Sequence, residues 1–69
     1  MGIHWTEYTS NVTPKQAYAL DQQAEANGCC NGLDWLARCN GVSSSKMTKI
    51  LSNAVAARSA IDKAFKAAK

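Results

Sequence analysis

Apolar residues along this chain recur every three or four positions, whereas no stretch of useful length alternates with period two. Three- and four-residue spacing is typical of amphipathic helices, and period-two alternation is typical of strands. The pattern therefore predicts an all-α fold, a small three- to four-helix domain. The 69 residues suit one domain over 1–69, although a core of this size is marginal and favours a dimer.

The clearest predicted helix begins after Thr13. Thr-Pro-Lys-Gln combines a capping hydroxyl, a proline at the first helical position and Gln16 three residues after the cap, which is a capping box. Asn27-Gly28 predicts the end of this helix, because both residues tolerate a left-handed conformation. Residues 1–12 show no clear period and form an N-terminal arm, in which Trp5 and Tyr8 make a short apolar turn or pack on the body.

Two short helices are predicted in the middle of the chain. The first covers Leu33 to Cys39 and ends at Asn40-Gly41, where the sequence favours a turn. The second is capped by Ser43 or Ser44 and continues at least to Leu51.

Residues 52–69 are rich in alanine and lysine and predict a long basic C-terminal helix. Whether Ser52-Asn53 separates this helix from the preceding one is left open by the sequence. Without a break, one helix of about 25 residues would carry apolar residues seven apart, a dimerisation seam formed by Met47, Ala54, Ile61 and Ala68.

The net charge of +3 is unevenly distributed. Residues 1–45 carry two basic and four acidic side chains, a balance of −2, whereas residues 46–69 carry six basic side chains against Asp62, a balance of +5. A basic third of this kind suits a polyanionic partner or serves as a solvated lysine face.

Other features argue against an enzyme, a metal site, a cofactor or a membrane protein. No segment is apolar enough to span a bilayer, and the N-terminus lacks the pattern of a signal peptide, so a cytoplasmic location is expected. Cys29, Cys30 and Cys39 are expected to be reduced, buried small hydrophobes rather than zinc ligands with His4, because adjacent cysteines lack zinc-knuckle spacing.

Two residue types have simple structural interpretations. The sole histidine, His4, has no acidic partner nearby in sequence and is expected to be a surface or packing residue. The glycines form no phosphate-binding loop, and three of them are interpreted as helix stops, namely Gly28, Gly32 and Gly41.

Residues 33–52 have the spacing of a helix-turn-helix. Its features are an apolar and a small residue before the turn, a glycine in the turn, and apolar residues on the inner face of the second helix: Leu36, Ala37, Gly41, Val42, Met47 and Ile50. The stretch resembles the DNA-binding segments of the lactose-repressor family and of the lambdoid phage repressor and Cro proteins. Asn40 departs from these families, which usually place an apolar residue before the glycine.

The resemblance implies a small transcriptional regulator that binds double-stranded DNA, as a homodimer in a bacterial or phage setting. In these families the positions of Ser44, Ser45 and Lys49 face base edges, whereas those of Lys46, Thr48 and Ser52 contact phosphate, and Ser43 caps the recognition helix. Because serines give little bidentate readout, modest intrinsic specificity is expected.

A second interpretation is a helical protein-interaction module, an inhibitor or adaptor that docks on a larger protein. A tight turn at Gly41 between two steeply crossing short helices would favour DNA binding. One unbroken helix from Ser44 to Lys69, packed antiparallel on residues 14–27, would favour the module.

Overall fold

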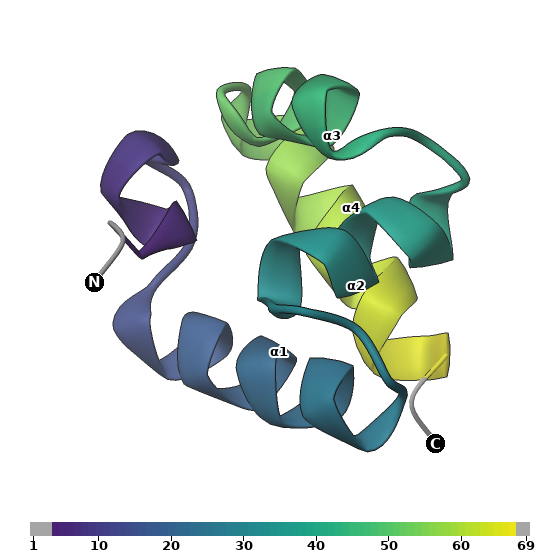
Figure 1. Cartoon of the computed structure of the whole chain (residues 1–69). Coiled ribbons are helices and arrows are strands. Elements are labelled where there is room, and N and C mark those ends of the chain that lie inside the picture. The colour runs from purple at the N-terminus through teal and green to yellow at the C-terminus, as the bar shows by residue number, and fades with distance from the viewer. Residues whose placement is uncertain (1–3, 68–69) are drawn as a thin grey trace.

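A computed structural model describes residues 4–67, apart from the side chain of Tyr8. A short 3-10 helix precedes four α-helices: η1 (Trp5–Tyr8), α1 (Pro14–Ala26), α2 (Gly32–Asn40), α3 (Ser44–Leu51) and α4 (Ala54–Ala67) (Figure 1). No strand occurs in residues 4–67, and the predicted all-α fold is confirmed. None of the described helices is both long and apolar enough to cross a bilayer.

The second helix, α2, is the centre of the fold, because it packs against α1, α3 and α4. Figure 1 shows α1 along one side of α2 and α3 along the other. From the end of α3, α4 runs to the opposite end of the molecule. The two helices α1 and α3 are therefore separated by α2.

One apolar core joins all of these elements. Its largest fully buried side chains are those of Trp5, Leu20, Leu36, Met47 and Leu51. Burial of one such side chain stabilises a fold by roughly 1.5–3 kcal/mol. Trp5 is only 2% exposed, so the N-terminal arm both forms a short turn and packs on the body.

The ends of α1 follow the predicted chemistry. Thr13 Oγ1 accepts a hydrogen bond from the Gln16 N–H, and Gln16 Oε1 accepts one from the Thr13 N–H, both at 3.1 Å. At the other end Gly28 has φ +73°, and the Cys29 N–H donates to the Ala24 carbonyl at 2.8 Å. These contacts form a capping box and a Schellman-type end, and both predicted ends are confirmed.

The helices α3 and α4 are separate. Asn53 caps α4, because its side-chain oxygen accepts from the Ala56 N–H at 3.0 Å and its carbonyl accepts from the Ala57 N–H at 2.8 Å. The continuous helix and its dimerisation seam are therefore not formed. Met47 and Ile61 of that seam are instead buried in the chain's own core, Ala54 is exposed, and Ala68 lies outside the described residues.

The interpretation of Gly32 as a helix stop is wrong, because this glycine is the first residue of α2. A Cβ at this position would lie 2.7 Å from Cζ2 of Trp5 and 2.9 Å from Oδ1 of Asp21. The missing side chain lets the buried indole lie directly against the start of α2. Gly28 and Gly41, with φ +73° and +66°, end helices as predicted.

Candidate nucleic-acid interface

The turn between α2 and α3 has the local geometry expected at residues 40–43. Gly41 is left-handed, with φ +66° and ψ 33°, and caps the C-terminal end of α2. The Val42 N–H then donates to the Ala37 carbonyl at 3.0 Å, which closes a Schellman-type end. A residue with a Cβ is disfavoured at positive φ, so the glycine permits the chain to turn directly into α3.

Ser43 begins α3 as its N-cap. Its Oγ accepts from the Lys46 N–H at 3.2 Å, and its carbonyl accepts from the Met47 N–H at 2.9 Å. Of the two predicted caps, Ser43 and Ser44, it is therefore Ser43 that caps the helix. The cap fixes where α3 starts and hence which residues face outward.

The two faces of α3 differ sharply. Met47 and Leu51 are fully buried in the core, and Ile50 is half-buried against it. The side chains of Ser45, Lys46 and Lys49 are exposed on the outer face of α3. The two flanking residues, the N-cap Ser43 and the C-cap Ser52, are exposed as well. Five predicted site residues are thus exposed, three on the outer face of α3 and one at each of its ends.

Two further predicted site residues, Ser44 and Thr48, are half-buried and use their hydroxyls within the fold. Ser44 Oγ donates to Oδ1 of Asp34 at 2.7 Å, and Thr48 Oγ1 donates to the Ser44 carbonyl at 3.0 Å. Ser52 is exposed, but its hydroxyl donates to the Lys49 carbonyl at 2.6 Å. Within residues 4–67, the exposed side chains of Ser45, Lys46 and Lys49 form no side-chain hydrogen bond and project into solvent.

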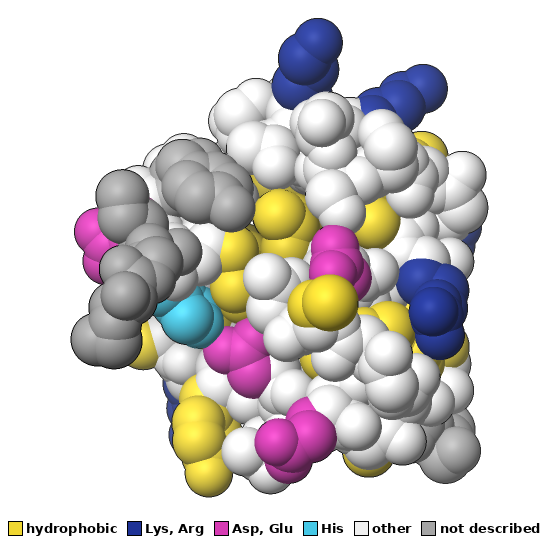
Figure 2. Space-filling view, viewed as in Figure 1, with side chains coloured by type: hydrophobic (Ala, Val, Ile, Leu, Met, Phe, Trp, Pro, Cys, Tyr) yellow, Lys and Arg dark blue, Asp and Glu magenta, His cyan; other side chains and the backbone are white. Residues whose placement is uncertain are grey.

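The charge on α3 is purely basic, since Lys46 and Lys49 have no acidic neighbour within the helix. Figure 2 shows basic side chains protruding from the surface over α3, whereas the acidic side chains on this face lie below them, spread from the left edge across the middle to the lower edge. Lys46 and Lys49 form a small basic patch on α3. The basic residues of α4 do not continue this patch, because α4 runs away from α3 (Figure 1). Lys66 there pairs with Asp62 at 3.1 Å, and Lys69 lies outside the described residues.

Asn40 departs from the helix-turn-helix pattern, and the fold gives this side chain a specific role. Its Nδ2 donates to the Leu36 carbonyl at 2.8 Å and to the Ala60 carbonyl at 3.3 Å. The amide therefore joins the last turn of α2 to α4 immediately before the Gly41 turn. A polar residue is tolerated here because two backbone acceptors meet it.

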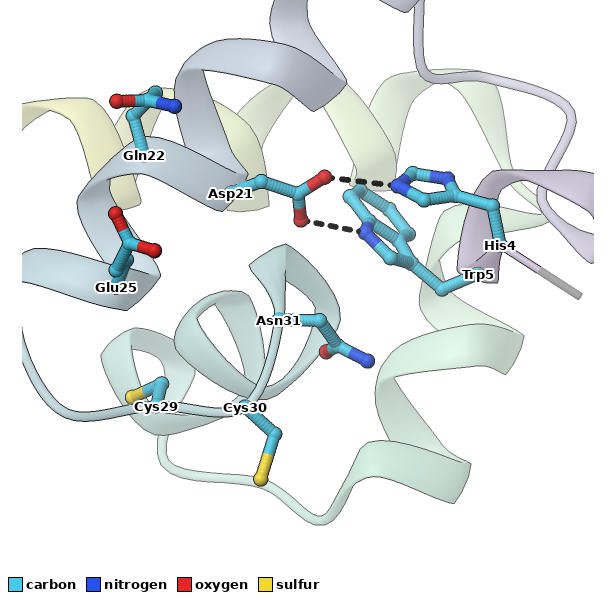
Figure 3. A pocket seen from close by; sticks show the side chains of 8 residues that line it. All are labelled: His4, Trp5, Asp21, Gln22, Glu25, Cys29, Cys30 and Asn31. Atoms are coloured by element: carbon cyan, nitrogen blue, oxygen red, sulfur yellow. Dashed lines mark hydrogen bonds and ion pairs between the residues drawn. The ribbon is translucent and has the colours of Figure 1, made fainter. Parts of the chain in front are cut away.

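A second cluster of polar residues surrounds Asp21 on α1, on the side of the molecule shown in Figure 3. Oδ1 of Asp21 accepts from the Trp5 indole N–H at 2.9 Å and from the Gly32 N–H at 2.7 Å, and Oδ2 contacts His4 Nε2 at 2.8 Å (Figure 3). One carboxylate thus connects η1, α1 and α2. His4 is exposed as expected, yet it has an acidic partner 17 residues away.

The pKa of Asp21 is lowered by this cluster. Burial by itself raises it, but the hydrogen bonds from Trp5, His4 and Gly32 outweigh that effect. A carboxyl group with a lowered pKa in the folded state stabilises the fold above its unfolded pKa of about 3.9. That contribution is lost as the pH falls through the lower, folded pKa.

Replacing Asp21 with asparagine is expected to lower the free energy of unfolding near pH 6 and to flatten its fall below about pH 4. The asparagine cannot offer two charged acceptors to Trp5, Gly32 and His4, so the difference from the wild type should shrink in acid. Urea unfolding at several pH values measures this. Glu25→Gln is the matched control, because this exposed carboxylate lines the same pocket as Asp21 (Figure 3). An equal difference from the wild type at every pH would contradict the role of Asp21.

The cysteines are free thiols in differing surroundings. Cys29 and Cys39 are half-buried against the core, and burial, then the neighbouring Cys29, raises the pKa of Cys39. The expectation that all three are buried is wrong for Cys30, which is exposed on the connector before α2 and diverges from Cys29 (Figure 3). No group of three or more His, Cys, Asp or Glu side chains among the described residues is placed to hold a metal ion.

Comparison of the chain with protein-family models, curated proteins and solved structures finds no match. The geometry and charge of the chain's own residues are therefore the guide to its function.

Proposed function

We propose that this protein binds duplex DNA through the outer face of α3, as a small transcriptional regulator of the helix-turn-helix type. The observation that carries the proposal is the junction of α2 and α3. A left-handed Gly41 leads directly into an eight-residue helix whose inner face is buried at Met47 and Leu51 and whose outer face carries two lysines. The likeness of residues 33–52 to repressor and Cro segments supports the same function.

The dimensions of α3 suit the major groove. An α-helix with its side chains is about 10–12 Å in diameter, which fits the groove's width of about 12 Å. In this arrangement Lys49 donates to guanine O6 or N7 and Lys46 contacts phosphate, while Ser45 offers a hydroxyl to a base edge. Because the Ser44 hydroxyl is bound to Asp34, it contributes less to readout than its position alone implies.

Few bases can be read by one lysine and one serine, so intrinsic specificity is modest. Single small modules also bury too little surface for tight, specific binding. A homodimer on two half-sites would supply the missing affinity, and we include this assembly in the proposal. The interaction-module alternative is less well supported. It requires one unbroken helix from Ser44 to Lys69, whereas α3 ends at Leu51 and α4 begins at Ala54.

A salt titration of binding to a random duplex tests the proposal. Contacts to phosphates release counterions, so log affinity should fall linearly with log salt, with a slope of about −2 to −4 for a module of this size. Fluorescence anisotropy of a labelled duplex, from about 50 to 200 mM salt, measures the slope. A protein that binds no duplex at the lowest salt would overturn the proposal.

A further inference from the structure

We infer that Asn11 is a positioning residue for α3: from the N-terminal arm, its side-chain amide holds the C-terminal end of the proposed DNA-binding helix. The consequence for DNA binding rests on the proposed function, whereas the consequence for the order of α3 does not.

The contact that carries the inference joins residues forty apart in sequence. Asn11 Nδ2 donates to the Leu51 carbonyl at 2.7 Å, and the Asn11 side chain is half-buried there. The side chain of Leu51 is fully buried. This carbonyl belongs to the last residue of α3, so no backbone N–H within the helix can donate to it.

Donors from three different residues meet the last three carbonyls of α3. The Lys49 carbonyl accepts from the Ser52 N–H at 3.2 Å, and the Ile50 carbonyl accepts from the Asn53 N–H at 3.1 Å. The Leu51 carbonyl receives the amide of Asn11. Only this third donor comes from outside the α3–α4 connection, and it is therefore the one that ties the helix end to another part of the fold.

The N-terminal arm can act as a brace because it is fixed on both sides of Asn11. On one side Trp5 is buried in the core, and its indole N–H donates to Asp21. On the other side Val12 packs against the core and Thr13 caps α1. A displacement of the end of α3 would break the contact with Asn11 rather than carry the arm with it.

A helix of two turns needs such a brace. Helices this short are not stable by themselves and take their orientation from tertiary contacts. A side chain that reads a base edge must be held within about 0.5 Å and 10–20° of its productive geometry. Lys49 lies about half a helical turn before Leu51. The Asn11 contact therefore helps to fix the position of the Lys49 amine.

Asn11→Ala tests the inference. We expect affinity for the random duplex to fall about three- to tenfold, the range of one lost hydrogen bond, while the salt slope stays unchanged because no positive charge is removed. Backbone amides at the end of α3 should exchange faster with solvent. Asn11→Asp should bind more weakly still, because a carboxylate can only accept and would face the Leu51 carbonyl.

Asn27→Ala is the matched control. Asn27 Nδ2 donates to the Gln23 carbonyl at 2.7 Å, a bond of the same length at the end of α1, and its loss should leave duplex affinity within about twofold. Wild-type affinity and wild-type α3 exchange in Asn11→Ala would overturn the inference. If the wild type binds no duplex, the proposed function fails, and amide exchange alone decides whether Asn11 positions α3.

Discussion

Replacing Lys49 with glutamate is expected to lower the affinity for duplex DNA by at least about thirtyfold and to leave the fold intact. A lysine contact to a guanine edge contributes roughly 1–3 kcal/mol, and the introduced carboxylate adds repulsion from the phosphates. Lys49 is exposed and forms no ion pair within residues 4–67, so the fold does not depend on its charge. Anisotropy titration at fixed salt measures the affinity, and a urea midpoint verifies the fold.

Lys63→Glu is the control for Lys49→Glu. It makes the same change in net charge at an exposed position of α4, whose chain runs away from α3 (Figure 1). At about 0.15 M salt, charges more than ~8 Å from the duplex are largely screened, so the control should lose no more than about threefold. Equal losses in the two variants would contradict a specific role for Lys49 and would indicate binding by net charge alone.

The helix boundaries could be predicted from the sequence because they depend on contacts between residues close in the chain. The Thr13 capping box and the Gly41 turn are each closed by hydrogen bonds that span three to five residues. Chemistry of this kind can be recognised from residue types at fixed spacing. The same holds for the Asn53 cap, although without the structure the helical propensity of its neighbours left a continuous helix possible.

The contacts that orient the helices could not be predicted in this way. Asp21 meets Trp5 across 16 residues, and Asn11 meets Leu51 across 40. Neither pair follows a periodicity or a known spacing, so only the packing of the core brings the partners together. The prediction of the DNA-contacting residues was limited in the same way. The contact of Ser44 with Asp34, which occupies the Ser44 hydroxyl, depends on how α2 and α3 pack.

The patch of basic residues shows why sequence proximity is an incomplete guide to a surface. Residues 46–69 look predominantly basic along the chain, but the break after Leu51 redirects α4 away from α3. The basic surface of α3 therefore consists of Lys46 and Lys49. A duplex bound there would meet a small basic surface, which agrees with the modest affinity we expect of a single module.

The Gly32 position gives the strongest test of the packing itself. Alanine has a higher helix propensity than glycine by about 1 kcal/mol, so local preference alone predicts that Gly32→Ala stabilises α2. Packing predicts the opposite, because the new Cβ would lie 2.7 Å from the buried Trp5 ring and 3.0 Å from Cβ of Leu20. Neither neighbour is the mobile end of a flexible chain, so the clash must displace η1, α1 or α2.

We therefore expect Gly32→Ala to lower the free energy of unfolding by about 2 kcal/mol, within the usual range for an overpacked core. Urea unfolding measures the loss, and near-ultraviolet circular dichroism reports the displacement of Trp5. Gly28→Ala is the control: a Cβ there meets no atom within 4 Å, so only the left-handed φ of +73° costs stability, roughly 1–2 kcal/mol. The two substitutions separate the effects, because only Gly32→Ala should disturb the indole. A Gly32→Ala protein as stable as the wild type would mean that the arm does not pack against the start of α2.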